Sequence, residues 1–183
     1  IDDGAGQYVD LQTFLMATQT DAFVVVHRGR VLVEHYANGM EAATPHILMS
    51  VSKSILGLLV GILAEKGVLD LEAPVQEYLP ELKGSAFLDA SVRQLLDMRS
   101  GLDFDEDYLA TSGPIIEYRK STNWNPLGPG ETPTDLRTFM LSLKDADGPH
   151  GGLFDSKSPS TDLLGCIIER AAGRRYADLF SDL

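Results

Sequence analysis

The sequence is poor in cysteine, long apolar runs and recognisable signals. Its one cysteine, Cys166, cannot form an internal disulfide, and its place on an apolar helical face with Leu163 and Ile167 predicts a small buried side chain rather than a reactive thiol. No run approaches the roughly 18 apolar residues of a membrane span. The chain opens with neither a basic secretory leader nor a Met, so its location stays open, with the cytoplasm slightly favoured over the periplasm.

Positive charge is also scarce, because 15 Lys and Arg face 27 Asp and Glu, for a net charge of −12. The basic residues form only small groups, such as Arg28 with Arg30, and this excludes the basic face that nucleic-acid binding needs. An acidic surface promotes solubility and favours neutral or cationic substrates over anionic ones.

Several chemical signatures are missing. The sequence contains no His-Glu-x-x-His, Cys-x-x-Cys or Asp-x-Asp-x-Asp-Gly metal motif, no Gly-x-Ser-x-Gly elbow and no phosphate-binding glycine loop. The four histidines lack metal-ligand spacing and are interpreted as structural or solvated: His27, His35, His46 and His150. We therefore expect no metal and no cofactor.

Two β-branched segments, residues 22–27 and 31–36, flank Arg28-Gly29-Arg30 and predict a β-hairpin. The first segment is apolar nearly throughout, which predicts a strand covered on both faces. Because an isolated two-stranded hairpin is not stable, we expect its partner strands to be missing and the chain to be incomplete at its C-terminal end.

Most of the remaining sequence predicts helices, over residues 8–17, 50–66, 74–79, 91–98, 134–143, 160–172 and from 176 onward. Residues 50–66 are apolar almost all round and predict a central buried helix that ends at Gly67. Ser91 and Thr134 are predicted N-caps, and Gly173 is a predicted stop.

Residues 100–133 and 148–159 predict loops, and loops this long inside a compact domain are usually functional. The first loop carries an acidic cluster, interpreted as a solvated turn with substrate contact as the alternative: Asp103, Asp105, Glu106 and Asp107.

The chemistry centres on Ser50-Val-Ser-Lys53, a Ser-x-x-Lys motif at the start of the apolar helix. Residues three apart share a helix face, so Lys53 can reach the Ser50 hydroxyl. Lys53 can activate this serine only as a neutral amine, which burial favours, and the helix N-terminus favours a developing oxyanion. The alternative is an N-cap serine followed by a lysine that extends to solvent, and the spacing alone does not separate the two.

Four segments together resemble the class C β-lactamase-related serine hydrolases of the penicillin-recognising superfamily, and among them the nylon-oligomer hydrolases. They are Met49 to Ser54, Val75 to Leu82, Val92 to Met98 and Ser158 to Gly165. The resemblance implies an α/β fold, an α+β sandwich in which an antiparallel sheet carries an inserted helical region. It places residues 1–40 in the sheet region and 41–183 in the helical region, with further strands and a third motif (Lys-Thr-Gly or similar) beyond residue 183.

The resemblance implies that Ser50 is the nucleophile and Lys53 the base, and that Tyr108 and Trp124 bind substrate. Packing beneath the loop is the alternative for Trp124. The family's Tyr-x-Ser or Tyr-x-Asn motif is altered, because Ser156 stands where the tyrosine relays a proton to the leaving group. Three alternatives follow: the protein is a natural variant with impaired or rerouted proton transfer, it carries an inactivating Tyr→Ser substitution, or a water takes the place of the phenol.

The expected function is hydrolysis of a small ester or linear amide, similar to 6-aminohexanoate oligomers, through an acyl-Ser50 intermediate. The alternatives are a catalytically impaired or non-catalytic penicillin-binding relative, and a β-lactamase or D-alanyl peptidase. The expected partner is a small-molecule substrate, and homodimer formation stays open.

Overall fold

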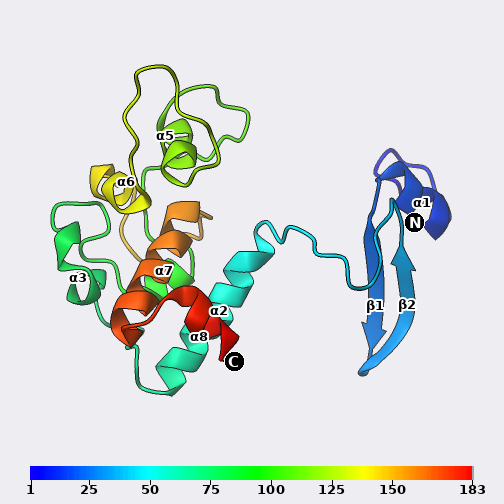
Figure 1. Cartoon of the computed structure of the whole chain (residues 1–183), viewed down its shortest axis with the longest axis horizontal. Helices are drawn as coiled ribbons and strands as arrows, with labels where there is room; N and C mark the ends of the chain where they lie inside the picture. Colours follow the sequence, from blue (N-terminus) through cyan, green and yellow to red (C-terminus); the bar gives the residue numbers. More distant parts are fainter. Residues whose placement is uncertain (183) are drawn as a thin grey trace. The chain divides into compact units, whose positions relative to one another are not determined.

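The computed structural model describes residues 1–182, which form two compact units, Ile1–Leu48 and Met49–Leu183. In the first unit, helix α1 (Leu11–Ala17) precedes strands β1 (Ala22–His27) and β2 (Arg30–Tyr36) (Figure 1). Asp10 caps α1, because its carboxylate accepts a hydrogen bond from the Thr13 amide over 2.9 Å.

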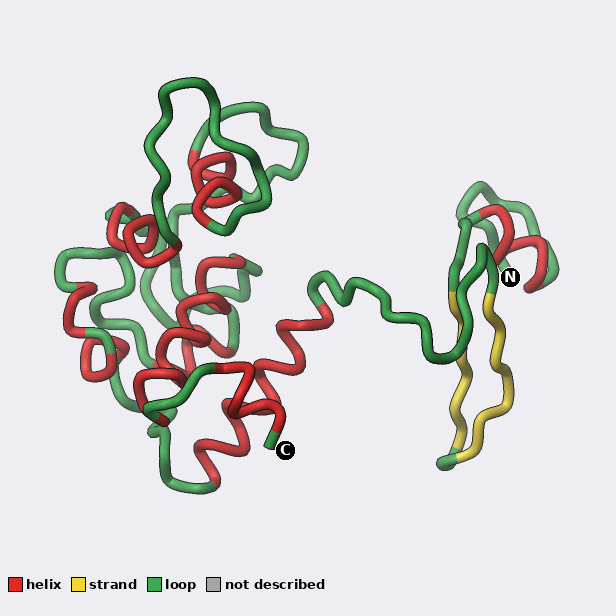
Figure 2. Tube along the Cα trace, in the orientation of Figure 1, coloured by secondary structure: helices red, strands yellow, loops and turns green. Residues whose placement is uncertain are grey.

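The predicted hairpin is present as an antiparallel pair, with Ala22 opposite Tyr36 and His27 opposite Arg30. Arg28 and Gly29 both have positive φ, 49° and 75°, as a two-residue turn of matching twist requires. Among the described residues the hairpin holds all the strand structure (Figure 2). The predicted cover on both faces of β1 is absent, since Val24 and Val26 are exposed and no third strand pairs with it in residues 1–182.

The second unit is helical. Its elements are α2 (Val51–Glu65), α3 (Val75–Tyr78), the 3₁₀ helix η1 (Pro80–Leu82), α4 (Val92–Leu96), α5 (Pro114–Ser121), α6 (Leu136–Ser142), α7 (Ser158–Ala172) and α8 (Tyr176–Ser181). Helix α7 is the centre, and it packs against α2, α3, α4 and α8 (Figure 1). Its Leu163, Leu164, Ile167 and Ile168 are all at most 2% exposed.

Several predicted boundaries are confirmed, and three predictions about the helices are wrong. Ser91 caps α4 in a reciprocal capping box with Gln94, and Gly173 ends α7 in a left-handed conformation. Helix α6 is capped by Asp135 rather than Thr134. Helix α2 buries one face only, with Leu58 62% exposed.

The third error concerns α5, which lies inside the predicted 100–133 loop. The α5 sequence starts at a proline and is rich in charged residues, so it lacks the strong apolar stripe from which a helix is predicted. Ile115 is its main buried apolar anchor. No helix within residues 1–182 combines the length and apolar character needed to cross a membrane.

Candidate active site

Ser50 stands directly before the first residue of α2, and its side chain makes no capping hydrogen bond. Capping is the ordinary use of a serine at this position, so the hydroxyl is left free for other chemistry. The preceding residue, Met49, has a φ of 48°. Such left-handed backbone in a non-glycine residue is unfavourable by itself and concentrates at functional sites, where it orients a neighbouring group.

Lys53 lies one turn along α2, and its Nζ donates a hydrogen bond to Ser50 Oγ over 3.2 Å. Lys53 is half-buried and takes part in none of the ion pairs found in residues 1–182. The neighbouring Ser52 is occupied, because its hydroxyl donates to the Met49 carbonyl over 2.6 Å. Of the two serines in the motif, Ser50 is therefore the one held by the lysine.

Both residues line a pocket of about 680 Å³ that lies entirely within the helical unit. The walls come from the start of α2, the 106–108 loop, α5, the residues after α5, α7 and the start of α8. The charged and aromatic members of the lining are Lys53, Glu106, Tyr108, Tyr118, Arg119, Trp124, Asp162, Glu169 and Tyr176.

Tyr118 and Asp162 form a second polar pair in this pocket, since the Tyr118 hydroxyl donates to Asp162 Oδ2 over 2.5 Å. Burial, with the adjacent Asp162 carboxylate, raises the pKa of Tyr118 above its ordinary value. Burial also raises the pKa of Asp162, against the opposing effects of the Tyr118 hydroxyl and the Lys53 charge. Lys53 is thus coupled electrostatically to a carboxyl on α7 as well as bonded to Ser50.

An aromatic cluster holds the Tyr118 ring in place. Phe104 meets Tyr118 edge-on with ring centroids 5.8 Å apart, and Phe139 lies 5.6 Å from Tyr118 and 6.0 Å from Phe104. Phe104 is 1% exposed and Phe139 5% exposed, so both rings belong to the core. The cluster joins the loop after residue 100, α5 and α6, and therefore sets the position of the phenol.

Backbone hydrogen bonds join residues 98–103 to residues 145–155 in a seam, and these two segments lead into the 106–108 loop and into α7, which both line the pocket. The seam includes the amide of Asp147 to the Gly101 carbonyl at 3.1 Å and the amide of Gly151 to the Arg99 carbonyl at 2.8 Å. Beyond the seam, the Ser158 amide donates to Glu106 Oε2 over 2.8 Å, which ties the start of α7 to the acidic loop. Glu106 is half-buried in the pocket, so the interpretation of the whole cluster as a solvated turn is wrong for this residue.

The structure brings together four of the five predicted site residues. Ser50, Lys53, Tyr108 and Trp124 all line the pocket, where Tyr108 is 67% and Trp124 62% exposed. Ser156 is exposed, two residues before α7, and is not among the lining residues.

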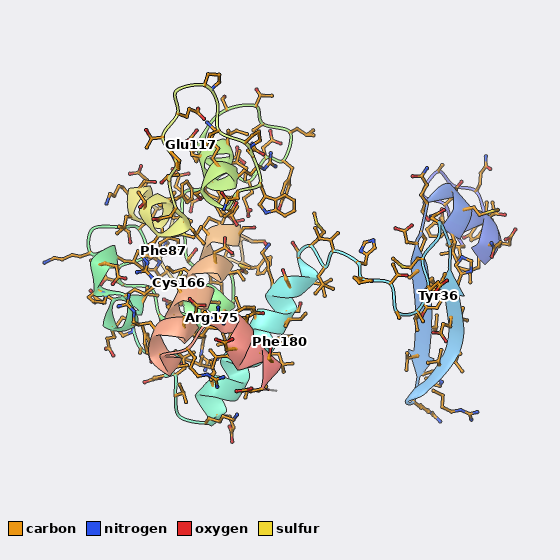
Figure 3. All side chains as sticks on the ribbon, viewed as in Figure 1. Tyr36, Phe87, Glu117, Cys166, Arg175 and Phe180 are labelled. Carbon is orange, nitrogen blue, oxygen red and sulfur yellow. The ribbon has the colours of Figure 1, made fainter. Side chains whose placement is uncertain are left out.

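Cys166 corrects the expectation of a fully buried side chain. It lies on α7 (Figure 3), is half-buried and contributes to the pocket wall. Burial raises the pKa of its thiol, which opposes thiolate formation. Within residues 1–182, no three His, Cys, Asp or Glu side chains gather as a metal site would need.

Sequence reasoning missed Tyr118, Arg119 and Asp162 as site residues. Tyr118 and Arg119 fall in the segment predicted as loop, and Asp162 is separated from Tyr118 by 44 residues. One signal was present, because Asp162 is the one charged residue between Ser158 and Ile168, next to the apolar stripe of α7.

Comparison with known proteins gives the lineage. Residues 12–183 match the family described as beta-lactamase. The chain belongs to the β-lactamase family. It is 39% identical over 181 residues, 99% of the chain, to 6-aminohexanoate-dimer hydrolase of Paenarthrobacter ureafaciens, of which it covers 45%.

Solved structures of the family agree with this fold. A protein of Bacillus anthracis provisionally assigned as a 6-aminohexanoate-dimer hydrolase superposes with a TM-score of 0.80 at 29% identity, over 95% of this chain and 46% of the other. A class C β-lactamase of Rhodobacter sphaeroides gives a TM-score of 0.61 at 22% identity, over 94% and 45%. The predicted β-lactamase/transpeptidase-like fold is confirmed, and the chain spans less than half the length of these relatives.

Proposed function

We propose that this protein is a serine hydrolase that cleaves small esters or linear amides through an acyl-Ser50 intermediate. The observation that carries the proposal is the hydrogen bond from Lys53 Nζ to the uncapped Ser50 hydroxyl at the wall of a pocket large enough for a small molecule. The similarity to 6-aminohexanoate-dimer hydrolase supports a linear amide as one substrate class.

The chemistry follows from the two side chains. As Ser50 Oγ attacks the substrate carbonyl carbon, its proton passes to the neutral Lys53 amine. The resulting ammonium protonates the leaving alcohol or amine as the C–O or C–N bond breaks, which leaves an acyl ester on Ser50. Water then attacks this ester, gives a proton to Lys53 and releases the acid, and the Ser50 hydroxyl is restored. Backbone N–H groups at the start of α2 favour the negative charge that develops on the carbonyl oxygen.

Labelling with a fluorophosphonate, followed by mass spectrometry of the peptide that contains residue 50, tests the proposal. We expect one adduct on Ser50, none in Ser50→Ala, and strong reduction in Lys53→Met, because the base is removed. Ser54→Ala is the matched control, since Ser54 is an exposed serine on the same helix outside the pocket lining. A folded protein that carries no adduct on Ser50 would refute the proposal.

A non-catalytic relative that binds ligand without turnover is the second candidate, and the serine at position 156 favours it. Tight ligand binding with no covalent adduct would support this alternative. Nitrocefin turnover would instead indicate β-lactamase activity, as the name of a relative from Providencia stuartii, 33% identical over 99 residues, suggests.

A further inference from the structure

None of the charged side chains that line the pocket takes part in an ion pair found in residues 1–182, and they differ in their hydrogen bonds. All three of its carboxylates accept hydrogen bonds from the chain itself: Glu106 from the Ser158 amide at 2.8 Å, Asp162 from Tyr118, and Glu169 from the Tyr176 amide at 2.7 Å. Of its two cations, Lys53 is engaged with Ser50. Arg119, the other, takes part in no ion pair found in residues 1–182.

Basic side chains without an ion pair are common in residues 1–182, Arg28, Arg30 and Arg99 among them, so what distinguishes Arg119 is its place in the pocket wall. The next residue on α5, Lys120, pairs with both Glu117 and Glu131, at 3.2 Å and 2.6 Å. Arginines on other elements also pair with carboxylates, for example Arg170 with Glu81 at 2.7 Å. Acid partners are therefore abundant, and Arg119 in the pocket wall has none among the described residues.

The Arg119 side chain is held in place, which keeps its guanidinium oriented. One terminal nitrogen donates to the Tyr108 carbonyl oxygen over 3.2 Å, and the guanidinium carbon lies 5.5 Å from the centroid of the Tyr108 ring. A guanidinium has five N–H donors, and this one bond leaves most of its planar fork unused within the described structure. Arg119 is half-buried, so a ligand bound there would be shielded in part from water.

We propose that Arg119 is a subsite for a carboxylate group of the substrate, so that the pocket selects esters or amides that carry a free carboxylate. The inference rests on the proposed hydrolase function and names its substrate class. The planar fork matches a carboxylate in two parallel hydrogen bonds. The three carboxylates of the lining repel a dianion such as phosphate more strongly than a singly charged group. The acidic balance of the sequence favoured neutral or cationic substrates, and Arg119 supplies a positively charged group within that acidic setting.

Calorimetric titration of Ser50→Ala protein tests the subsite without turnover. The two probes are 6-acetamidohexanoate and its carboxamide, 6-acetamidohexanamide, which share length and shape and differ in charge. We expect the carboxylate to bind at least about tenfold more tightly, as one charge-assisted interaction at a half-exposed site supplies. Adding Arg119→Gln should bring the two affinities within about threefold of each other, and Arg119→Lys should retain part of the preference.

Lys144→Gln in the same background is the matched control, because it removes an exposed positive charge outside the pocket lining and should preserve the preference. Equal affinities in the parent, or a preference that Arg119→Gln leaves unchanged, would overturn the subsite. The binding assay does not depend on acylation of Ser50. The subsite proposal and the hydrolase proposal can therefore be refuted independently, the first by the titration and the second by the labelling.

Discussion

Replacement of Gly101 by alanine should strongly destabilise the helical unit, because both the backbone conformation and the lack of space at this position require glycine. Its φ is 62°, a region that is unfavourable for a residue with a side chain. A Cβ there would also lie 2.4 Å from the Gly148 carbonyl oxygen and 2.9 Å from its carbonyl carbon. Both neighbours are backbone atoms, so no side-chain rotation can relieve the overlap.

The loss of stability in Gly101→Ala can be estimated from the hydrogen bonds of the seam between residues 98–103 and 145–155. The left-handed conformation alone costs about 1 kcal/mol for alanine. Moving the 145–155 segment away weakens seam hydrogen bonds, each worth about 1 kcal/mol, and two or three of them lie close to Gly101. A total near 3–4 kcal/mol lowers the melting temperature by about 10 °C for a domain of this size.

Thermal unfolding followed by circular dichroism measures the loss, with Gly130→Ala as the matched control. Gly130 also has positive φ, 80°, but a Cβ there meets no atom within 4 Å. The control should therefore lose only about 1 kcal/mol, or roughly 2–4 °C. If Gly101→Ala loses no more than Gly130→Ala, the steric contact is not what demands glycine, and the reasoning about the seam is refuted.

Two further predictions concern the pocket. Burial raises the pKa of Asp162 in the folded protein, so ionisation of this carboxyl opposes folding. The protonated carboxyl therefore contributes to stability at low pH, and that contribution is lost as the pH rises through the folded-state pKa. The melting temperature of Asp162→Asn, relative to that of the parent, should therefore rise as the pH is raised from about 4 to about 8. A difference between the two melting temperatures that stays constant over this range would contradict the assignment. Ser156→Tyr should raise ester or amide hydrolysis by about 10-fold or more if this position is the vacated proton relay, and an unchanged kcat/KM would show that it is not.

Local signals in the sequence were enough for the elements whose stability is decided locally. The capping box of Ser91 and Gln94, the left-handed stop at Gly173 and the two-residue turn at Arg28-Gly29 each depend on side-chain or backbone chemistry within a few residues. The contact between Ser50 and Lys53 belongs to the same class, because helical spacing alone puts them on one face.

Elements with weak local signals were misjudged. Helix α5 lacks a strong apolar stripe, and its stability depends on burying Ile115 and on placing Tyr118 against Phe104 and Phe139. The cap of α6 went to Asp135 rather than Thr134 because the two adjacent residues are chemically equivalent candidates, and only the backbone path chooses between them.

The sequence by itself determined the helix that carries Ser50 and Lys53, the hairpin, and the family pattern that made acyl transfer the leading hypothesis. Only the tertiary structure decided what surrounds that pair. Tyr118 with Asp162, and Glu106 with the Ser158 amide, are contacts across 44 and 52 residues. Long-range contacts of this kind arise when apolar faces pack, and no local spacing encodes which polar groups are then brought into one pocket.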